Sequence, residues 1–265
     1  MIKKIILSLA TALSLSGCIS LSDLSSNIET GLIDPKGMKV AAALLKNGDA
    51  GTAAGIYEKL LNDQPTNVDL LYGHATAIYE EGKYRDALIA YEKLNAETGG
   101  NCDAFVGMGN SHLKLGRPTV AGSFFAQCLL GDNDHEAALL GRAISFDAIG
   151  QSSQALAFYQ KAISQNPQDL GLRNNYGLSL LMAGRSQAAI NEFGKIAFSE
   201  FSTVQMRQNL ALAYAMAGDT GAAEKVAGLD LSTQRVANNM KIYEYVRNLP
   251  GNEALKSLIF HGIVQ

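Results

Sequence analysis

Residues 143–159 have the sequence AISFDAIGQSSQALAFY, and the spacing of four residues within it decides the fold. Ala143 stands seven positions before Gly150, while Ala155 and Tyr159 stand five and nine positions after it. A glycine recurs every 34 residues without a gap, at Gly48, Gly82, Gly116, Gly150, Gly184 and Gly218. A fixed period of this length predicts a solenoid of six stacked units.

Three further positions keep the phase of the glycines. Seven residues before each glycine the side chain is always small: Ala41, Ala75, Gly109, Ala143, Gly177 and Ala211. Five residues after it stands alanine in every unit: Ala53, Ala87, Ala121, Ala155, Ala189 and Ala223. Nine residues after it five units carry an aromatic residue: Tyr57, Tyr91, Phe125, Tyr159 and Phe193.

Each repeated position has a physical role in a pair of antiparallel helices. Glycine in the turn adopts a positive φ and closes the first helix. Small residues on both sides of the turn allow the two helices to approach closely. The aromatic residue follows the alanine by four positions, so it shares a helical face with it and fills the space beside the small groups.

These residues and this period resemble the tetratricopeptide repeat, although the tryptophan often found early in the first helix is absent throughout. The resemblance covers residues 34–237 and implies an all-α fold, a right-handed superhelix of about six helix-turn-helix repeats. Asp34 and Pro35 suit its start, as an N-cap and a first-turn proline.

The period ends after Gly218, because position 252 carries asparagine instead of glycine. We expect a helix over about 234–248, ending before Pro250, and a short segment over 253–260. Residues 238–265 would then cap the open end of the last repeat, whose apolar face must be covered.

The first residues have the pattern of a secretory signal. Lys3 and Lys4 precede the apolar stretch 5–15, whose eleven residues are too few to span a bilayer as a helix. The following Leu15-Ser16-Gly17-Cys18 resembles the lipobox of bacterial lipoproteins, in which the cysteine thiol is acylated before cleavage.

The sequence therefore predicts a lipoprotein signal peptide over 1–17, a lipid anchor at Cys18 and a Ser-rich tether over 18–33. An ordinary signal peptide that ends near a cysteine is the alternative. Ile19 follows Cys18 where lipoproteins retained at the inner membrane carry aspartate, so the resemblance favours the outer membrane.

Composition excludes several classes of protein. Of 265 residues, 47% are hydrophobic and 18% are charged, which gives enough apolar surface for a core. The 22 basic and 25 acidic residues leave a net charge of −3, so nucleic acid is disfavoured as a ligand. Three cysteines are too few for a disulfide scaffold.

The concave side of such a superhelix is lined by the first helix of each unit and forms a groove for a peptide. Positions 10, 9, 6 and 2 residues before each turn glycine are expected to face it. The candidate partner-binding residues among their polar or aromatic occupants are Tyr72, Asn110, Lys114, Asn174, Asn175, Gln208 and Asn209.

Asparagine and glutamine there hydrogen-bond a peptide backbone in both directions. Alternatively, Asn175 and Asn209 bond carbonyls within the solenoid. The first two of these positions carry a basic residue only in the first unit, at Lys39, which disfavours the clamping of a partner's C-terminal carboxylate along the groove.

Nothing in the sequence predicts catalysis. The four histidines, His74, His112, His135 and His261, lie in different units, and no His-Glu-x-x-His pair or other metal-ligand spacing occurs. No nucleophile elbow or phosphate loop is present either. We therefore expect no enzyme activity, no cofactor and no metal.

Cys102 and Cys128 stand fourteen residues before and twelve residues after Gly116. Antiparallel helices joined at this glycine bring both positions side by side at the open end of the unit. A disulfide there would stabilise the chain by about 3 kcal/mol through the loop it closes. Two buried free thiols are the alternative.

The C-terminal third has a more particular resemblance, over about residues 170–245. It rests on residues 174–180 with Gly184-Arg185, residues 207–214 with Ala217-Gly218-Asp219, and residues 236–239 with Tyr243. These segments resemble the TadD family, the tetratricopeptide lipoproteins of tight-adherence (Flp) pilus systems.

The TadD resemblance implies an outer-membrane lipoprotein that supports assembly or localisation of the secretin ring. A scaffold for outer-membrane protein insertion or for peptidoglycan enzymes is the second hypothesis, and an accessory to an enzyme on a separate chain is the third.

Overall fold

The computed structural model describes residues 35–261 of the 265-residue chain. The expected signal peptide over 1–17, Cys18 and the tether over 18–33 lie outside the described residues, as do the last four residues of the expected cap.

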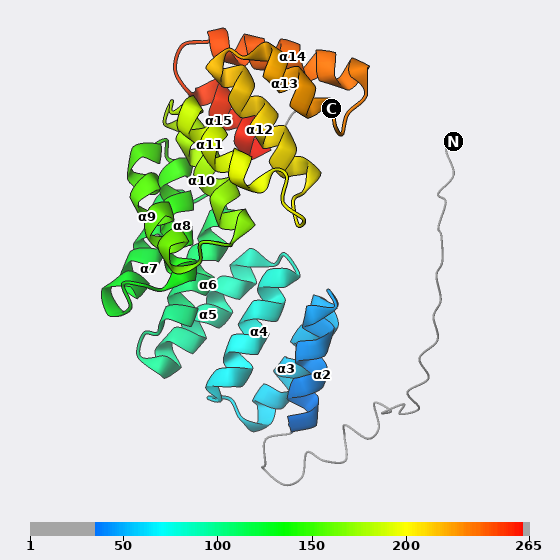
Figure 1. The fold of residues 1–265 in the computed structure, drawn as a ribbon. Helices are drawn as coiled ribbons and strands as arrows, with labels where there is room; N and C mark the ends of the chain where they lie inside the picture. Colours follow the sequence, from blue (N-terminus) through cyan, green and yellow to red (C-terminus); the bar gives the residue numbers. More distant parts are fainter. Residues whose placement is uncertain (1–34, 262–265) are drawn as a thin grey trace, which may run out of the picture.

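Fourteen α-helices and no strand make up the described part of the chain, which confirms the all-α prediction (Figure 1). Twelve of them form six helix-turn-helix units: α2 (Pro35–Lys46) with α3 (Ala50–Asp63), α4 (Val68–Glu80) with α5 (Tyr84–Thr98), α6 (Cys102–Lys114) with α7 (Pro118–Gly131), α8 (Glu136–Ala148) with α9 (Ser152–Gln165), α10 (Leu170–Met182) with α11 (Ser186–Ile196), and α12 (Val204–Ala217) with α13 (Thr220–Ala227).

The repeated glycines lie in the turns of the six units. All six adopt a positive φ, between 70° at Gly116 and 88° at Gly218. Residues with a side chain rarely adopt this conformation, so glycine is required at this position of the repeat.

The aromatic residue of the repeat packs against small residues of the first helices. Phe125 is fully buried, and a Cβ added to Gly109 of the same unit would lie 2.7 Å from its ring. The ring also contacts Gly141 of the next unit. Ala143 and Ala155 are likewise fully buried, as the close approach of the paired helices requires.

The units stack into a curved superhelix (Figure 1). The first helices α4, α6 and α8 lie on the inner side of the curve, and the second helices α5, α7 and α9 lie along its outer edge. Within residues 35–261, no helix combines the length and apolar character that crossing a membrane requires.

Two further helices follow the sixth unit, α14 (Thr233–Asn248) and α15 (Glu253–His261). The first of these confirms the helix expected over 234–248, and its side chains Val236, Met240, Tyr243 and Val246 join the core that α12 and α13 form.

The position of α15 differs from the expected cap. It folds back against α10 in the fifth unit instead of extending over the open end. The Asn252 side chain donates to the Met182 carbonyl at the end of α10, at 2.6 Å, and Leu255 is buried. The loop at Pro250-Gly251, where Gly251 has a φ of 74°, allows this reversal of direction.

Candidate protein-binding site

The first helices of units two and three present the most open of the residues expected to bind a partner. Tyr72 on α4 is 44% exposed, and Lys114 at the end of α6 is also exposed. Asn110, one turn before Lys114, is half-buried. These three side chains offer an aromatic ring, a cation and an amide to a protein partner.

In units five and six, the side chains of Asn174 and Asn209 form a hydrogen bond with each other, so these amide groups are not free to bind a partner in the groove. The Asn209 amide donates to Asn174 Oδ1 at 2.8 Å, and Asn209 Oδ1 accepts from the Gln205 amide at 3.0 Å. Only 6% of Asn209 is exposed. The prediction that Asn209 faces the groove is therefore wrong, and its contacts are internal, to side chains instead of carbonyls.

The packing of the earlier units explains this position. Nine residues before the turn glycine, units two to four carry Gly73, Gly107 and Gly141, each in contact with the aromatic ring of the preceding unit. This position thus faces the joint between units. Asn175 stands there in unit five, where it is half-buried and has no side-chain hydrogen bond to the described residues.

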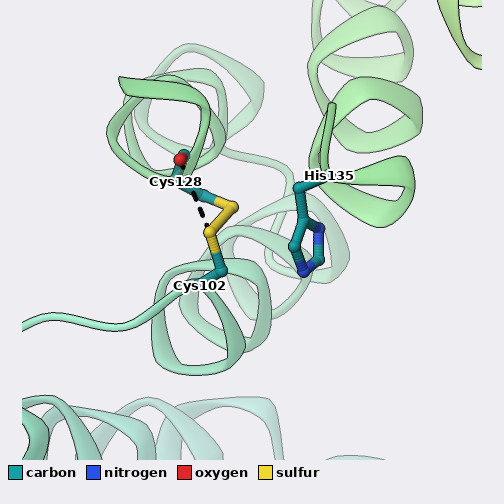
Figure 2. A group of neighbouring side chains, drawn as sticks. All are labelled: Cys102, Cys128 and His135. Carbon is teal, nitrogen blue, oxygen red and sulfur yellow. Dashed lines mark hydrogen bonds between the residues drawn. A yellow bond between two sulfur atoms is a disulfide. The ribbon is translucent and has the colours of Figure 1, made fainter. Parts of the chain in front are cut away.

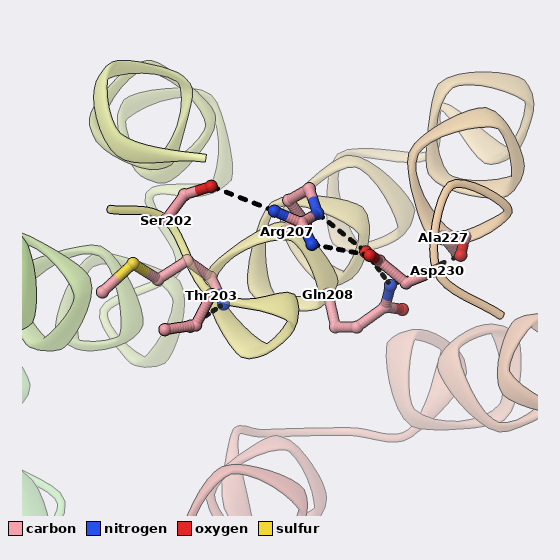
Figure 3. Close-up of polar contacts among 7 residues, drawn as sticks. Ser202, Thr203, Arg207, Gln208, Ala227 and Asp230 are labelled. Atoms are coloured by element: carbon pink, nitrogen blue, oxygen red, sulfur yellow. Dashed lines mark hydrogen bonds and ion pairs between the residues drawn. The ribbon is translucent and has the colours of Figure 1, made fainter. Parts of the chain in front are cut away.

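Gln208 belongs to a polar cluster at the joint of α12 with the loop after α13 (Figure 3). The Arg207 guanidinium donates to both carboxylate oxygens of Asp230, at 2.8 and 2.6 Å. The Gln208 amide donates to Asp230 at 3.3 Å and to the Ala227 carbonyl at 3.4 Å.

The hydrogen bond from Arg207 lowers the pKa of the Asp230 carboxyl, so this aspartate stays ionised in the pair. Gln208 is half-buried and its amide nitrogen is already engaged, so the structure places it in an internal cluster. The ion pair of Arg207 with Asp230 and the hydrogen bonds of Gln208 hold the last unit against the segment that follows it.

A buried carboxylate joins units four and five, and the sequence analysis did not single it out. Asp147 is 2% exposed and accepts from the Tyr159 hydroxyl at 3.1 Å and from the Ser179 hydroxyl at 2.9 Å. Burial raises its pKa to about 6, although hydrogen bonds from Ser152, Ser179 and Tyr159 oppose the shift.

A signal for this residue was present in the repeat. Three positions before the turn glycine, the neighbouring units carry Leu113 and Leu181, so Asp147 is an acid in an apolar column of the aligned repeats.

Cys102 and Cys128 form a disulfide, with their Cα atoms 4.7 Å apart. His135 lies beside them, and Figure 2 shows its ring next to the two sulfurs. Repeat geometry thus brings together residues of two units that no familiar ligand spacing connects.

Comparisons with known proteins agree with this architecture. Models of the tetratricopeptide-repeat family match residues 41–101, 137–169 and 158–191. No curated protein matches the sequence.

Three solved structures show the same fold. A tetratricopeptide repeat protein from Parabacteroides merdae is 18% identical over 84% of this chain and 90% of its own, with a TM-score of 0.61. A thermophilic repeat protein from Thermus thermophilus is 18% identical over 67% of this chain and 97% of its own, with a TM-score of 0.59.

The third structure is the APC/C hetero-tetramer Cut9–Hcn1. Its matched chain is 15% identical over 84% of this chain and 46% of its own, with a TM-score of 0.68. At these identities the similarity shows the fold alone.

Proteins of this fold are generally scaffolds without catalytic activity, and they bind other proteins. The 34-residue period, the paired helices with their turn glycines and the family matches agree with one another. The chain is a tetratricopeptide-repeat protein.

Proposed function

We propose that this chain is an outer-membrane lipoprotein, without enzyme activity, that supports assembly or localisation of a tight-adherence (Flp) pilus secretion machine. It acts by protein–protein binding, on the secretin or another pilus-assembly component. The observation that carries the proposal is the resemblance of residues 170–245 to the TadD family, together with the lipobox that ends at Cys18.

The contacts in the described chain suggest different roles for its earlier and later units. In units five and six the polar residues of the resemblance bond internally, as Asn209 does with Asn174 and Gln208 with Asp230. Their role is to hold the repeats together. Partner binding then falls to the first helices of units two and three, where Tyr72 and Lys114 are open.

The chemistry of the open residues fits a protein ligand. Tyr72 supplies apolar area with a hydroxyl that donates or accepts, and aromatic side chains of this kind are enriched in protein interfaces. Asn110 bonds a backbone in either direction, and Lys114 adds one cation. A lipid at Cys18 would hold this surface near the membrane in which a secretin lies.

Replacement of Cys18 with serine tests the anchor. Without the thiol no acyl chain is attached, so the protein should leave the outer-membrane fraction and appear uncleaved or soluble in the periplasm. Envelope fractionation with immunoblotting measures this. The double variant Cys102→Ser with Cys128→Ser is the control, because it removes the two cysteines outside the lipobox and should remain in the outer membrane.

The same strains test whether the protein supports assembly of the pilus secretion machine. If the proposal holds, the Cys18→Ser strain loses secretin multimers and surface pili while the total amount of outer-membrane protein is unchanged. Normal secretin multimers in a strain that lacks the anchor would contradict it. A general loss of outer-membrane proteins, or altered cell shape, would instead support a scaffold for protein insertion or for peptidoglycan enzymes.

A further inference from the structure

Three helix ends meet at the joint between units three and four. Cys102 is the first residue of α6, Cys128 lies in the last turn of α7, and His135 is the N-cap residue of α8. One ligand atom from each, two sulfurs and an imidazole nitrogen, lie within 4.8 Å of one another (Figure 2).

The histidine is unusual for its place in the repeat. In units two, three, five and six the N-cap residues of the first helices are Asn67, Asn101, Asp169 and Thr203, which are types that cap helices well. Their oxygens accept the backbone N–H at 2.8–3.2 Å. His135 Nδ1 accepts it from Ala138 at 3.4 Å, so capping alone does not explain this residue.

We propose that the reduced form of this cluster binds one zinc-type divalent ion through the thiolates of Cys102 and Cys128 and the imidazole of His135. Sulfur and imidazole nitrogen are the ligands that Zn²⁺ prefers. The fourth position is open to water, as in other zinc sites with three protein ligands.

Reduction must precede binding, because a disulfide has no thiolate to offer. An external dithiol gives two electrons and two protons to the Cys102–Cys128 bond and is itself oxidised to a disulfide. The two thiols formed then lose their protons as they bind the ion, so each ion bound releases two protons. Oxidised and metal-bound forms therefore exclude each other.

The positions of the three residues suit a tetrahedral site. With Zn–S distances of about 2.3 Å and Zn–N distances of about 2.0 Å, ligand atoms lie roughly 3.3–3.8 Å apart. The sulfurs must separate from bonding distance, while the nitrogen is already within 4.8 Å of both. Cys128 is 1% exposed, whereas Cys102 and His135 are half-buried, which leaves an approach for the ion on their side.

Metal binding also has a structural consequence. If Nε2 binds the ion, the imidazole proton moves to Nδ1, and the contact with the Ala138 N–H is lost in exchange. The disulfide joins the two helices of unit three, since both cysteines belong to that unit. A metal ion would additionally link this unit to α8 of unit four through His135. The metal-bound form therefore has a link between units three and four that the disulfide form lacks.

The test uses the full chain in detergent, with Cys18→Ser in every sample so that only two cysteines remain. One sample is left oxidised, and the other is reduced with a phosphine, which takes oxygen from water, and is then kept without oxygen. Each is titrated with Co²⁺ followed by Zn²⁺. Absorption from thiolate-to-cobalt charge transfer reports the ligands, and elemental analysis gives the stoichiometry.

We expect the reduced chain to bind one ion, with thiolate charge transfer and tetrahedral cobalt bands that Zn²⁺ abolishes. The oxidised chain should bind none at this site. His135→Asn keeps a good N-cap residue and should weaken the affinity for the metal ion by at least about tenfold. Loss of a residue that only hydrogen-bonds a metal ligand already has an effect of this size, and His135 is proposed as a ligand itself. His74→Asn, in unit two, is the control and should bind as the parent chain does.

Two results would overturn the proposal. One is a reduced chain that binds no ion while its helical circular dichroism is unchanged. The other is a His135→Asn variant that binds as tightly as the parent, since the site would then need no imidazole. Cys102→Ser provides a second loss-of-ligand variant should His135→Asn fail to fold.

Discussion

Gly177 and Gly194 belong to the paired helices α10 and α11 of unit five, and their surroundings are opposite. A Cβ added to Gly177 would lie 2.6 Å from the ring of Phe193, which is fully buried, whereas one added to Gly194 would have nothing within 4 Å. The same substitution therefore has a different physical effect at each.

Gly177→Ala should lower the free energy of unfolding by about 1–3 kcal/mol, because the added methyl group overpacks the contact between α10 and the Phe193 ring of the same unit. Gly194→Ala should raise it by up to about 1 kcal/mol, because alanine is the better helix former at an open site. Urea denaturation followed by circular dichroism measures both. Equal denaturation midpoints for the two variants would show that the Phe193 ring does not pack closely against α10 at Gly177.

Asp147 gives the stability a pH dependence with a definite sign. Its folded pKa is raised from 3.8 to about 6, so the folded state holds the proton more tightly than the unfolded state. The stabilisation is complete below about pH 4 and is lost as the pH rises through 6. The shift corresponds to about 3 kcal/mol.

Asp147→Asn removes this titration while it keeps an oxygen that accepts from Ser179 or Tyr159. The difference in unfolding free energy between variant and parent should therefore change by about 2 kcal/mol between pH 4 and pH 7, in favour of the variant at the higher pH. Denaturation at a series of pH values measures it. A constant difference across this range would contradict the buried, titrating carboxyl.

Sequence reasoning at this scale succeeded where a residue repeats and failed where one deviates. The turn glycines and the small residues beside Phe125 followed from the period, since each unit meets the same steric demand. Asn209 was misplaced because a polar residue at a repeated position was assigned to the groove, whereas its column faces the joint between units. In units two to four this repeated position holds a glycine that contacts an aromatic ring of the preceding unit. Such a contact between units cannot be read from the spacing within one unit.

At the scale of helices, the disulfide joins the start of α6 to the last turn of α7, across 26 positions of sequence. The link restricts the unfolded chain more than the folded one, because the paired helices already hold the cysteines together. A loop of this size corresponds to about 3 kcal/mol in the loop-entropy model.

Reduction, with a chelator present to exclude metal, should therefore lower the unfolding free energy of the parent chain by about 3 kcal/mol. The double variant Cys102→Ser with Cys128→Ser should show no response to the reductant, which makes it the matched control. Denaturation midpoints with and without reductant measure the effect. A parent chain as stable after reduction as before would contradict the account.

The bounds of α14 and α15 were predictable to within a residue, because turns and caps are local signals. The course of α15 was not predictable. Its docking on α10 depends on Leu255 and on the bond from Asn252 to the Met182 carbonyl, and these contacts span 70 residues of sequence.

At the scale of the whole molecule, the superhelix separates residues that hold units together from residues that remain open. Asp147, Asn209 and the pair Arg207–Asp230 belong to joints between elements. Tyr72 and Lys114 remain exposed on the first helices α4 and α6. We propose that this open part of units two and three binds a component of a pilus secretion machine.

Site-specific photocrosslinking in the native envelope tests that claim most directly. A photoreactive amino acid replaces Tyr72 or Lys114 in one set of strains. In the control it replaces Ile89, which is 67% exposed on the second helix α5. The account predicts an adduct with the secretin or another pilus-assembly component from Tyr72 and Lys114, and none from Ile89. Adducts of equal yield from Ile89, or no such adduct from Tyr72 and Lys114, would contradict it.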